Sequence, residues 1–270
     1  VSMCVLWASQ RAKPHHHDTN SWGDWAFEIS KIDSEANTVH FSRGGFQEAR
    51  GSCGTGGHEW YIEGVKELLD APGEFFYDEE GSLLYYYFNE TTNIDSISFI
   101  ASKLATLISV NGTQEDPVKD VAISNVTLAH STPTFMDDYE VPSAGDWSIH
   151  RGGSVFLSGV ENATVELCTF DQIGGNGVCI SEYSRSTSIL SNTFRRIGDS
   201  AVLNVGATGY FTETPWVHND GNYPINTVVR GNLAHEIGLF TKQTAFFFQA
   251  LGWNSTVAEN VVFNGPRSGI

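Results

Sequence analysis

The sequence predicts an all-β protein, folded as a right-handed parallel β-helix with an N-terminal β-rich cap. Three observations predict it. A segment that starts with a β-branched residue recurs through the second half, an asparagine recurs at its fourth position, and a second apolar segment accompanies each copy. The composition agrees, because 27 Gly and 12% aromatic residues in 270 residues favour strands joined by tight turns.

Each copy of the recurring segment is predicted to form one short strand, in a basic unit of about 24 residues. Its copies begin 42, 24, 40 and 28 residues apart, at Ile123, Val165, Ile189, Val229 and Val257. The fourth position holds Asn192, Asn232 and Asn260 in three copies, with Cys168 and Val126 in the other two. Repetition at one phase predicts an inward asparagine ladder, in which side-chain amides bond from turn to turn and Cys168 fills the same row.

The second apolar segment of each unit is short, and several copies lie beyond an Ile-Gly turn. These segments are Val155–Leu157, Val178–Ile180, Val202–Asn204 and Ala245–Phe247. Stacked parallel strands are buried, so they read as apolar runs of this kind. A β-sandwich, the alternative, would need hairpin turns that the second half lacks. Residues 106–270 are therefore predicted to form the parallel β-helix.

Residues 1–105 do not follow the repeat and are predicted to form the cap that a β-helix needs over its first open edge. Within them, residues 75–88 predict a β-hairpin and residues 61–69 a short helix.

The chain stops at Ser268-Gly-Ile270, before the last unit completes its second strand. An uncovered last turn exposes a row of strand N–H and C=O groups that can pair with another chain. The expectation is a fragment of a longer β-helix, truncated at its C-terminal end, or self-association of β-helix edges into a ring or fibre. The two are not exclusive.

The charge excludes two classes of partner. Fifteen Lys and Arg stand against 32 Asp and Glu, which gives a net charge of −17 and a pI near 4.7. Such a surface repels phosphate backbones and anionic lipid. No apolar run reaches the ~18 residues of a membrane span. Neither nucleic acid nor membrane is expected as a partner, and no cofactor is predicted.

Sequons indicate an extracellular protein, secreted or on the cell surface. There are five, at Asn89, Asn111, Asn125, Asn162 and Asn254. The alternative is that these are unmodified turn asparagines. Cys4 and Cys53 are the candidate disulfide, which fits the same compartment. Cys168 is expected to be a buried thiol.

Several longer motifs resemble a known group of proteins. They are Trp60-Tyr-Ile-Glu-Gly-Val, Leu69-Asp-Ala-Pro-Gly-Glu-Phe-Phe-Tyr-Asp, Leu84-Tyr-Tyr-Tyr, Gly145-Asp-Trp-Ser-Ile-His-Arg-Gly-Gly153, His235-Glu-Ile-Gly, Lys242-Gln243 and Phe263-Asn-Gly-Pro-Arg267. Together they resemble a secreted branch of the right-handed parallel β-helix proteins of the pectin-lyase-like superfamily. The resemblance implies the fold but leaves the activity open, because the superfamily contains polysaccharide lyases, glycoside hydrolases, epimerases, phage tailspikes and structural rods.

Two insertions, residues 129–153 and 207–225, flank the stack of second strands and predict a glycan groove over it. The candidate substrate-binding residues are Asp146, Trp147, Arg151, Tyr183, Arg185 and Gln243. Glycoside hydrolysis needs two carboxylates about 5–10 Å apart, and turns stack roughly 4.8 Å apart, which favours Glu182 with Asp199.

A polysaccharide lyase is the other enzyme that this groove would suit. It would use Lys242, His235 or Tyr183 as the base, and Arg151 or Arg185 would neutralise a uronate carboxylate. No metal site is predicted, because the consecutive side chains of residues 15–18 (His-His-His-Asp) point in different directions.

Two hypotheses for the function follow from the sequence. One is a glycan-binding or glycan-processing β-helix, with the catalytic step left open; the other is a structural glycoprotein of a matrix, wall or fibre. In the second, residues such as His235 and Glu236 only bond turns. Convergence of Arg151, Glu182, Arg185 and Lys242 in one open cleft would favour the first hypothesis, and covered or scattered side chains the second.

Overall fold

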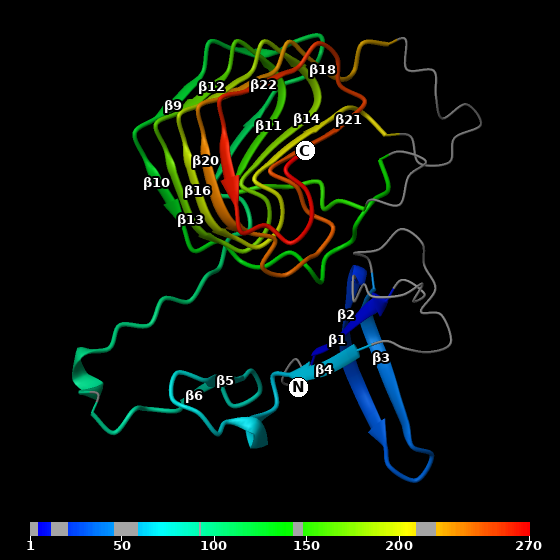
Figure 1. Ribbon diagram of the computed structural model, residues 1–270, viewed down its shortest axis with the longest axis vertical. Coiled ribbons are helices and arrows are strands. Elements are labelled where there is room, and N and C mark those ends of the chain that lie inside the picture. Colours follow the sequence, from blue (N-terminus) through cyan, green and yellow to red (C-terminus); the bar gives the residue numbers. More distant parts are fainter. Residues whose placement is uncertain (1–4, 12–20, 46–58, 92, 143–147, 209–219) are drawn as a thin grey trace. The chain divides into compact units, whose positions relative to one another are not determined.

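The computed structural model describes residues 5–11, 21–45, 59–91, 93–142, 148–208 and 220–270 (Figure 1). The chain divides into two compact units, one of residues 1–45 and 52–101 and one of residues 46–51 and 102–270. The helical elements of the described residues are two 3-10 turns, η1 (Lys66–Leu68) and η2 (Ile94–Ser96). No helix in these ranges is long and apolar enough to cross a membrane.

The first unit is antiparallel. Its four-stranded sheet has the order β3-β2-β1-β4, with β1 (Val5–Arg11), β2 (Ser21–Asp33), β3 (Thr38–Gly44) and β4 (Glu59–Glu63). The predicted hairpin is confirmed as β5 (Phe75–Asp78) paired with β6 (Leu83–Tyr86). The predicted helix over residues 61–69 is wrong. Gly64, with φ +71°, ends β4, and only η1 follows, since this backbone conformation does not continue into a helix.

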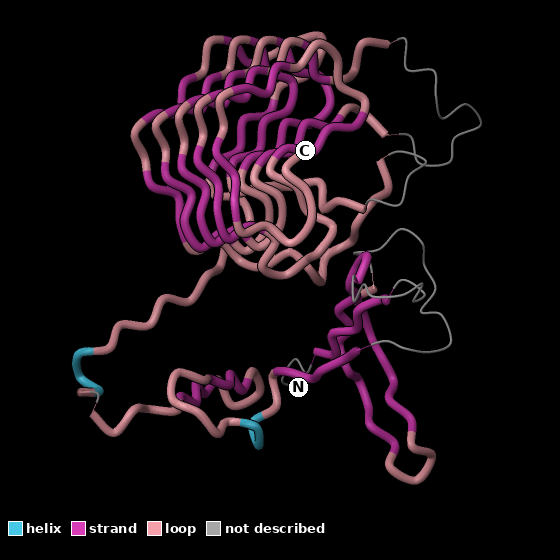
Figure 2. Tube along the Cα trace, in the orientation of Figure 1, coloured by secondary structure: helices cyan, strands magenta, loops and turns pink. Residues whose placement is uncertain are grey.

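The second unit consists of three parallel sheets that the chain visits in rotation (Figures 1 and 2). The β12 sheet contains β9 (Ala122–Ser124), β12 (Thr164–Glu166), β15 (Ser188–Leu190), β19 (Val228–Arg230) and β22 (Thr256–Ala258). The β13 sheet contains β10 (Thr127–Ala129), β13 (Thr169–Ile173), β16 (Thr193–Ile197), β20 (Leu233–Ile237) and β23 (Val261–Phe263).

The third is the β14 sheet, with β7 (Ile108–Asn111), β8 (Val118–Lys119), β11 (Val155–Glu161), β14 (Val178–Arg185), β17 (Val202–Val205), β18 (Pro224–Ile225) and β21 (Phe247–Ala250). The prediction of an all-β chain with stacked parallel strands is confirmed, and the rotation is consistent with a parallel β-helix. The last of the second apolar segments was predicted at Ala245–Phe247. The strand that it forms, β21, begins two residues later, at Phe247, which pairs with Val202.

Each copy of the recurring segment forms two strands, so the prediction of one strand per copy was wrong. The break falls just before the ladder position, at residues with a left-handed backbone such as Leu167 (φ +52°), Ser191 (φ +53°) and Glu259 (φ +58°). A left-handed residue reverses the pleat locally and turns the strand. The corner therefore separates the β12 sheet from the β13 sheet in every turn.

The asparagine ladder lies inside this corner, as predicted. The Asn192 amide Nδ2 donates to Asn232 Oδ1 at 3.0 Å, and Asn232 Nδ2 donates to Asn260 Oδ1 at 2.9 Å. The same two oxygens accept the backbone N–H groups of Asn192 and Asn232. Cys168 fills the row one turn earlier, and its N–H donates to Asn192 Oδ1 at 2.9 Å. The ladder thus satisfies backbone groups that the corner withdraws from the sheets.

The core is a column of apolar side chains between the three sheets. Phe170 and Phe194 are fully buried, pair across β13 and β16, and stack with ring centroids 4.6 Å apart. Burial of each such side chain contributes about 1.5–3 kcal/mol. A second, smaller cluster lies on the β14 sheet, where Ile149 of the first insertion packs with Cys179 and Leu203. Part of the predicted groove is thus filled by the insertion itself.

Substitution of the central ladder residue, Asn232→Ala, should lower the free energy of unfolding by about 1–3 kcal/mol, because it leaves buried backbone groups unpaired. Denaturant unfolding measures it. The matched control is Asn111→Ala, at an exposed residue of β7 whose backbone is not left-handed and whose amide donates to Ser109 Oγ. A surface substitution of this kind should change stability by less than about 0.5 kcal/mol. Equal losses in the two variants would contradict the role of the ladder.

Candidate functional site

A polar pocket of about 430 Å³ lies where β11 and β14 end, beside the loop that follows β7. Its lining is Gly112, Thr113, Gln114, Glu115, Ser158, Gly159, Glu182, Tyr183, Asp220 and Asn222. Two of these, Glu182 and Tyr183, were predicted as site residues. The pocket therefore combines the ends of the second-strand stack with the end of the second insertion.

A β-bulge presents Glu182 and Tyr183 to this pocket. Ser158 pairs with Ser181 but the next paired residues are Val160 and Ser184, so β14 has one residue more than β11 over this stretch. The extra residue bends the strand and redirects its side chains. Glu182 has a left-handed backbone, with φ +56°, and its side chain is exposed. In the preceding turn, the left-handed residue of the bulge is Gly159, with φ +62°.

The Tyr183 side chain is held in place by charged neighbours. Its hydroxyl donates to Glu161 Oε1 at 2.7 Å, and Lys119 Nζ lies 2.9 Å from Glu161 Oε2. The Arg185 guanidinium lies 4.1 Å from the centroid of the Tyr183 ring. The hydrogen bond to Glu161 raises the pKa of Tyr183, so the phenol stays protonated. The ring is thus a fixed aromatic surface at the pocket edge.

Arg185 also fastens the pocket wall. It donates to the carbonyl oxygens of Gly221 at 2.8 Å and Tyr223 at 2.6 Å. From the loop that follows β7, Gln114 Nε2 donates to the carbonyl oxygen of Asp220 at 2.8 Å. The segment around Asp220 is therefore bonded both to β14 and to the loop after β7, and the guanidinium of Arg185 is occupied by backbone carbonyls of the protein.

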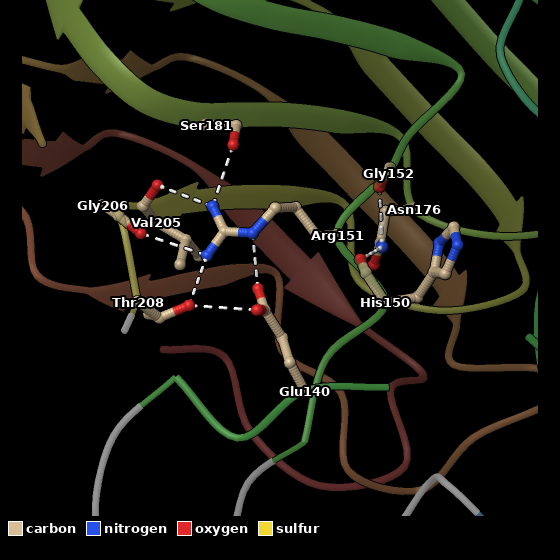
Figure 3. Close-up of polar contacts among 9 residues, drawn as sticks. All are labelled: Glu140, His150, Arg151, Gly152, Asn176, Ser181, Val205, Gly206 and Thr208. Atoms are coloured by element: carbon tan, nitrogen blue, oxygen red, sulfur yellow. Dashed lines mark hydrogen bonds and ion pairs between the residues drawn. The ribbon is translucent and has the colours of Figure 1, made fainter. Parts of the chain in front are cut away.

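Arg151 connects the bases of the two insertions (Figure 3). Its guanidinium donates to Glu140 Oε1, to Ser181 Oγ at 2.8 Å and to Thr208 Oγ1 at 2.8 Å. It also donates to the backbone carbonyls of residues 205 and 206. Thr208 Oγ1 in turn donates to Glu140 Oε2 at 3.0 Å. These contacts occupy the guanidinium fully, so a substrate carboxylate would have to displace protein groups to reach it.

Asp199 is buried beneath the first insertion and is only 5% exposed. It accepts hydrogen bonds from Tyr139 Oη at 3.0 Å and Thr241 Oγ1 at 3.1 Å. Burial raises the pKa of Asp199 to about 6, and these hydrogen bonds oppose the rise. The ring of His150 lies 6.0 Å from that of Tyr139, and burial lowers the pKa of His150, which keeps it neutral.

The structure does not bring Glu182 and Asp199 together. Val202 of β17 pairs with Val178 of β14. Asp199 lies three residues before Val202, whereas Glu182 lies four residues after Val178, so the two carboxylates lie toward opposite ends of the paired strands. At ~3.3 Å per residue, the two are separated by more than about 13 Å along the strands. The prediction joined them from neighbouring turns without knowing at which end of the strand each lies. Glu182 shares its pocket instead with Glu115 and Asp220.

The other predicted site residues are dispersed. His235 lies on β20 of the β13 sheet, where its ring stacks on Phe263 and its Nδ1 contacts Glu236. Gln243 is buried and accepts the backbone N–H of Ser148 at 3.3 Å. Lys242 adjoins Thr241, the partner of Asp199. Asp146, Trp147, Cys4 and Cys53 lie outside the described residues. In the described ranges, no three His, Cys, Asp or Glu side chains are grouped to hold a metal ion.

Sequence reasoning missed Gln114, Glu115, Asp220 and Asn222 as pocket residues. A signal for the first two was present, since a polar run follows the sequon at Asn111 directly after an apolar segment. The carboxyl ends of parallel strands meet at one edge of a sheet, so side chains after such strands gather there. All five sequon asparagines are exposed.

Comparison with known proteins gives one similar structure. No family model matches the chain, and no curated protein matches its sequence. A solved chain described as a glycoside hydrolase superposes with a TM-score of 0.72 and 16% sequence identity, over 90% of this chain. This chain spans 46% of the length of that one. The similarity shows a shared fold.

Asp199 should make stability depend on pH. Its pKa is about 6 in the folded protein and ordinarily 3.8, so the folded state holds this proton more tightly between these values. The contribution of Asp199 to unfolding free energy is therefore greatest below pH ~4 and falls by on the order of 3 kcal/mol as pH rises through ~6. Asp199→Asn removes this term. The stability difference between variant and parent should grow from pH 4 to 7, and parallel curves would contradict it.

Arg151→Lys should lower the free energy of unfolding by about 2–3 kcal/mol, because an ammonium cannot span the partners of the guanidinium and leaves buried carbonyls unpaired. Thermal unfolding measures it. The matched control is Arg230→Lys, at a half-exposed side chain with one ion pair of 4.0 Å to Glu259. Its expected effect is below about 0.5 kcal/mol. If both variants keep the parent stability, Arg151 does not fasten the insertions.

Proposed function

We propose that this protein binds and processes a glycan in the pocket at the ends of β11 and β14. The observation that carries the proposal is this pocket, in which side chains from two walls and a strand bulge converge. The fold that the chain shares with a glycoside hydrolase supports a carbohydrate ligand.

The chemistry of the lining suits sugar hydroxyl groups. Carboxylate and amide oxygens accept hydrogen bonds from hydroxyls, and the side-chain amides of Gln114 and Asn222 also donate them. Tyr183 offers a fixed aromatic edge against which the apolar face of a sugar ring can pack. A few placed polar groups around an aromatic surface are typical of small-ligand sites.

The charges favour a neutral or basic glycan over a uronate. Glu115, Glu182 and Asp220 are all acidic, and the described lining has no Lys, Arg or His. The two cationic side chains near the pocket are engaged by protein groups, since Lys119 pairs with Glu161 and Arg185 donates to backbone carbonyls. A glycan carboxylate would face three like charges without a counter-charge.

For hydrolysis, the pocket offers carboxylates in the number that the chemistry needs. A glycosidase uses one as general acid and a second as nucleophile or base. Glu182 is the exposed carboxylate on the bulge, and Glu115 or Asp220 replaces Asp199 as its partner, because these line the same pocket. A lyase is less favoured because its uronate would lack an available arginine.

The finer features of the fold and the compartment belong to this proposal. We infer a right-handed parallel β-helix of the pectin-lyase-like superfamily, with a basic turn of about 24 residues, and the capping role of residues 1–105 stays a prediction. Secretion is supported by five exposed sequons. Self-association through β-helix edges remains a prediction.

A structural glycoprotein is the second candidate. The observation that favours it is that Arg151, Glu182, Arg185 and Lys242 do not converge in one open cleft: of the four, Glu182 lines the pocket, while Arg151 and Arg185 fasten loops. A structural protein would have no measurable affinity for free oligosaccharides.

Glu182→Gln tests the proposal by calorimetric titration with neutral, amino-sugar and uronate oligosaccharides. A neutral or amino-sugar oligosaccharide should bind the parent, and the variant should bind it about tenfold more weakly, which is ~1.4 kcal/mol. Glu259→Gln is the matched control, at an exposed side chain of the β22–β23 corner. Binding of uronates alone, or equal affinities of both variants, would contradict the proposal.

A second variant, Glu182→Gly, separates binding from folding. Residue 182 has a left-handed backbone that glycine adopts without a steric penalty, so this variant should keep the thermal stability of the parent. It should nevertheless bind oligosaccharide more weakly, as Glu182→Gln does. Loss of both properties together would show that the residue serves the fold.

A further inference from the structure

We infer that Asn111 carries an N-linked glycan that stands at the mouth of the pocket and restricts access to it. This inference rests on the proposed function. It assigns to one of the five sequons a role in access to the pocket.

The sequon at Asn111 is part of the pocket wall. Asn111 ends β7 and pairs with Ser158 of β11, which lines the pocket. The other two sequon residues, Gly112 and Thr113, line it as well. The side chain of Asn111 is exposed, and its Nδ2 makes one hydrogen bond, to Ser109 Oγ at 2.7 Å. A glycan on this nitrogen therefore begins beside the pocket and in solvent.

The wall is held closely, so the attachment point is fixed relative to the pocket. The N–H of Gly112 donates to the carbonyl oxygen of Ser158 at 2.8 Å. A Cβ at residue 112 would lie 2.3 Å from the carbonyl oxygen of Gly159, another lining residue, so these two chain segments are in direct contact. Thr113 Oγ1 accepts the N–H of Asp116 at 3.0 Å, which holds the following turn.

The other sequons of the second unit do not line the pocket. Asn125 is the nearest match in local chemistry, because its Nδ2 also bonds one neighbouring hydroxyl, Ser124 Oγ, at 2.9 Å. It lies at the corner that follows β9. Asn162 and Asn254 lie at another corner, where their amides bond Asp120 and Asn226. A glycan at Asn125 is therefore a matched control for one at Asn111.

The expected consequence is a lower apparent affinity of the glycosylated protein. N-linked glycans are bulky and well hydrated, and one rooted on the wall covers the mouth for part of the time. Apparent affinity falls with the fraction of molecules whose pocket is open, so a glycan that covers the mouth in most molecules weakens binding roughly five-fold. The same glycan slows any large reagent that enters the pocket.

The experiment compares the chain secreted from a eukaryotic host with the same chain made in bacteria without N-glycosylation. Peptide masses of the secreted protein should show a glycan at Asn111. Secreted Asn111→Gln should bind oligosaccharide as tightly as the bacterial protein, and secreted parent and Asn125→Gln should both bind more weakly. An unmodified Asn111 peptide, or equal affinities of secreted parent and Asn111→Gln, would overturn the inference.

A second readout does not depend on a sugar ligand. In Glu115→Cys, a bulky maleimide should label the pocket thiol more slowly in secreted protein than in bacterial protein, and Asn111→Gln should remove the difference. Cys168 and Cys179 are buried, and the chain without the substitution gives the background rate. If labelling follows this pattern but no form binds a glycan, the proposed function fails and access control at Asn111 stands. Equal labelling rates overturn access control whatever the binding result.

Discussion

The stacking of one turn on the next is the constraint on which the rest of this structure depends. Parallel strands in three sheets hold their register only if every turn folds at the same corners. At one corner this is achieved by a left-handed residue followed by an asparagine, whose amide bonds the next turn. The ladder fixes where these turns fold at this corner, and the paired register of β11 and β14 sets which of their residues lie at the pocket.

The two insertions, residues 129–153 and 207–225, can be long because the stacked strands from which they leave are regular. Arg151 and Arg185 hold the insertions against the β14 sheet through backbone carbonyls, which ties loop geometry to the strands. The bulge at Glu182 is the local departure from regular pairing next to the pocket. Such departures beside a regular framework are where binding residues are commonly found.

The parts of the fold that repeat could be predicted from the sequence. Asn192, Asn232 and Asn260 share one phase, and this periodicity is enough to predict the ladder and the parallel strands. The split of each segment at Leu167 or Ser191 was not predictable, since a left-handed backbone at these residue types has no sequence signal. The antiparallel sheet of the first unit has no repeat and was described only as β-rich.

The site was less predictable because it depends on which end of a strand each side chain occupies. Glu182 and Tyr183 were identified from their place in the repeat, and both line the pocket. Asp199 was paired with Glu182 on turn spacing alone, which carries no information about position along the strand. Glu115 and Asp220 lie in segments outside the repeat, so only three-dimensional structure brings them to Glu182.

The most direct test of a glycan site at this pocket is a crystal structure of the protein soaked with a neutral or amino-sugar oligosaccharide. The account predicts a sugar ring against Tyr183, with a hydroxyl or amine within hydrogen-bond distance of Glu182. A sugar bound instead on the outer face of the β13 sheet, near His235 and Phe263, would contradict it. So would an empty pocket at saturating oligosaccharide.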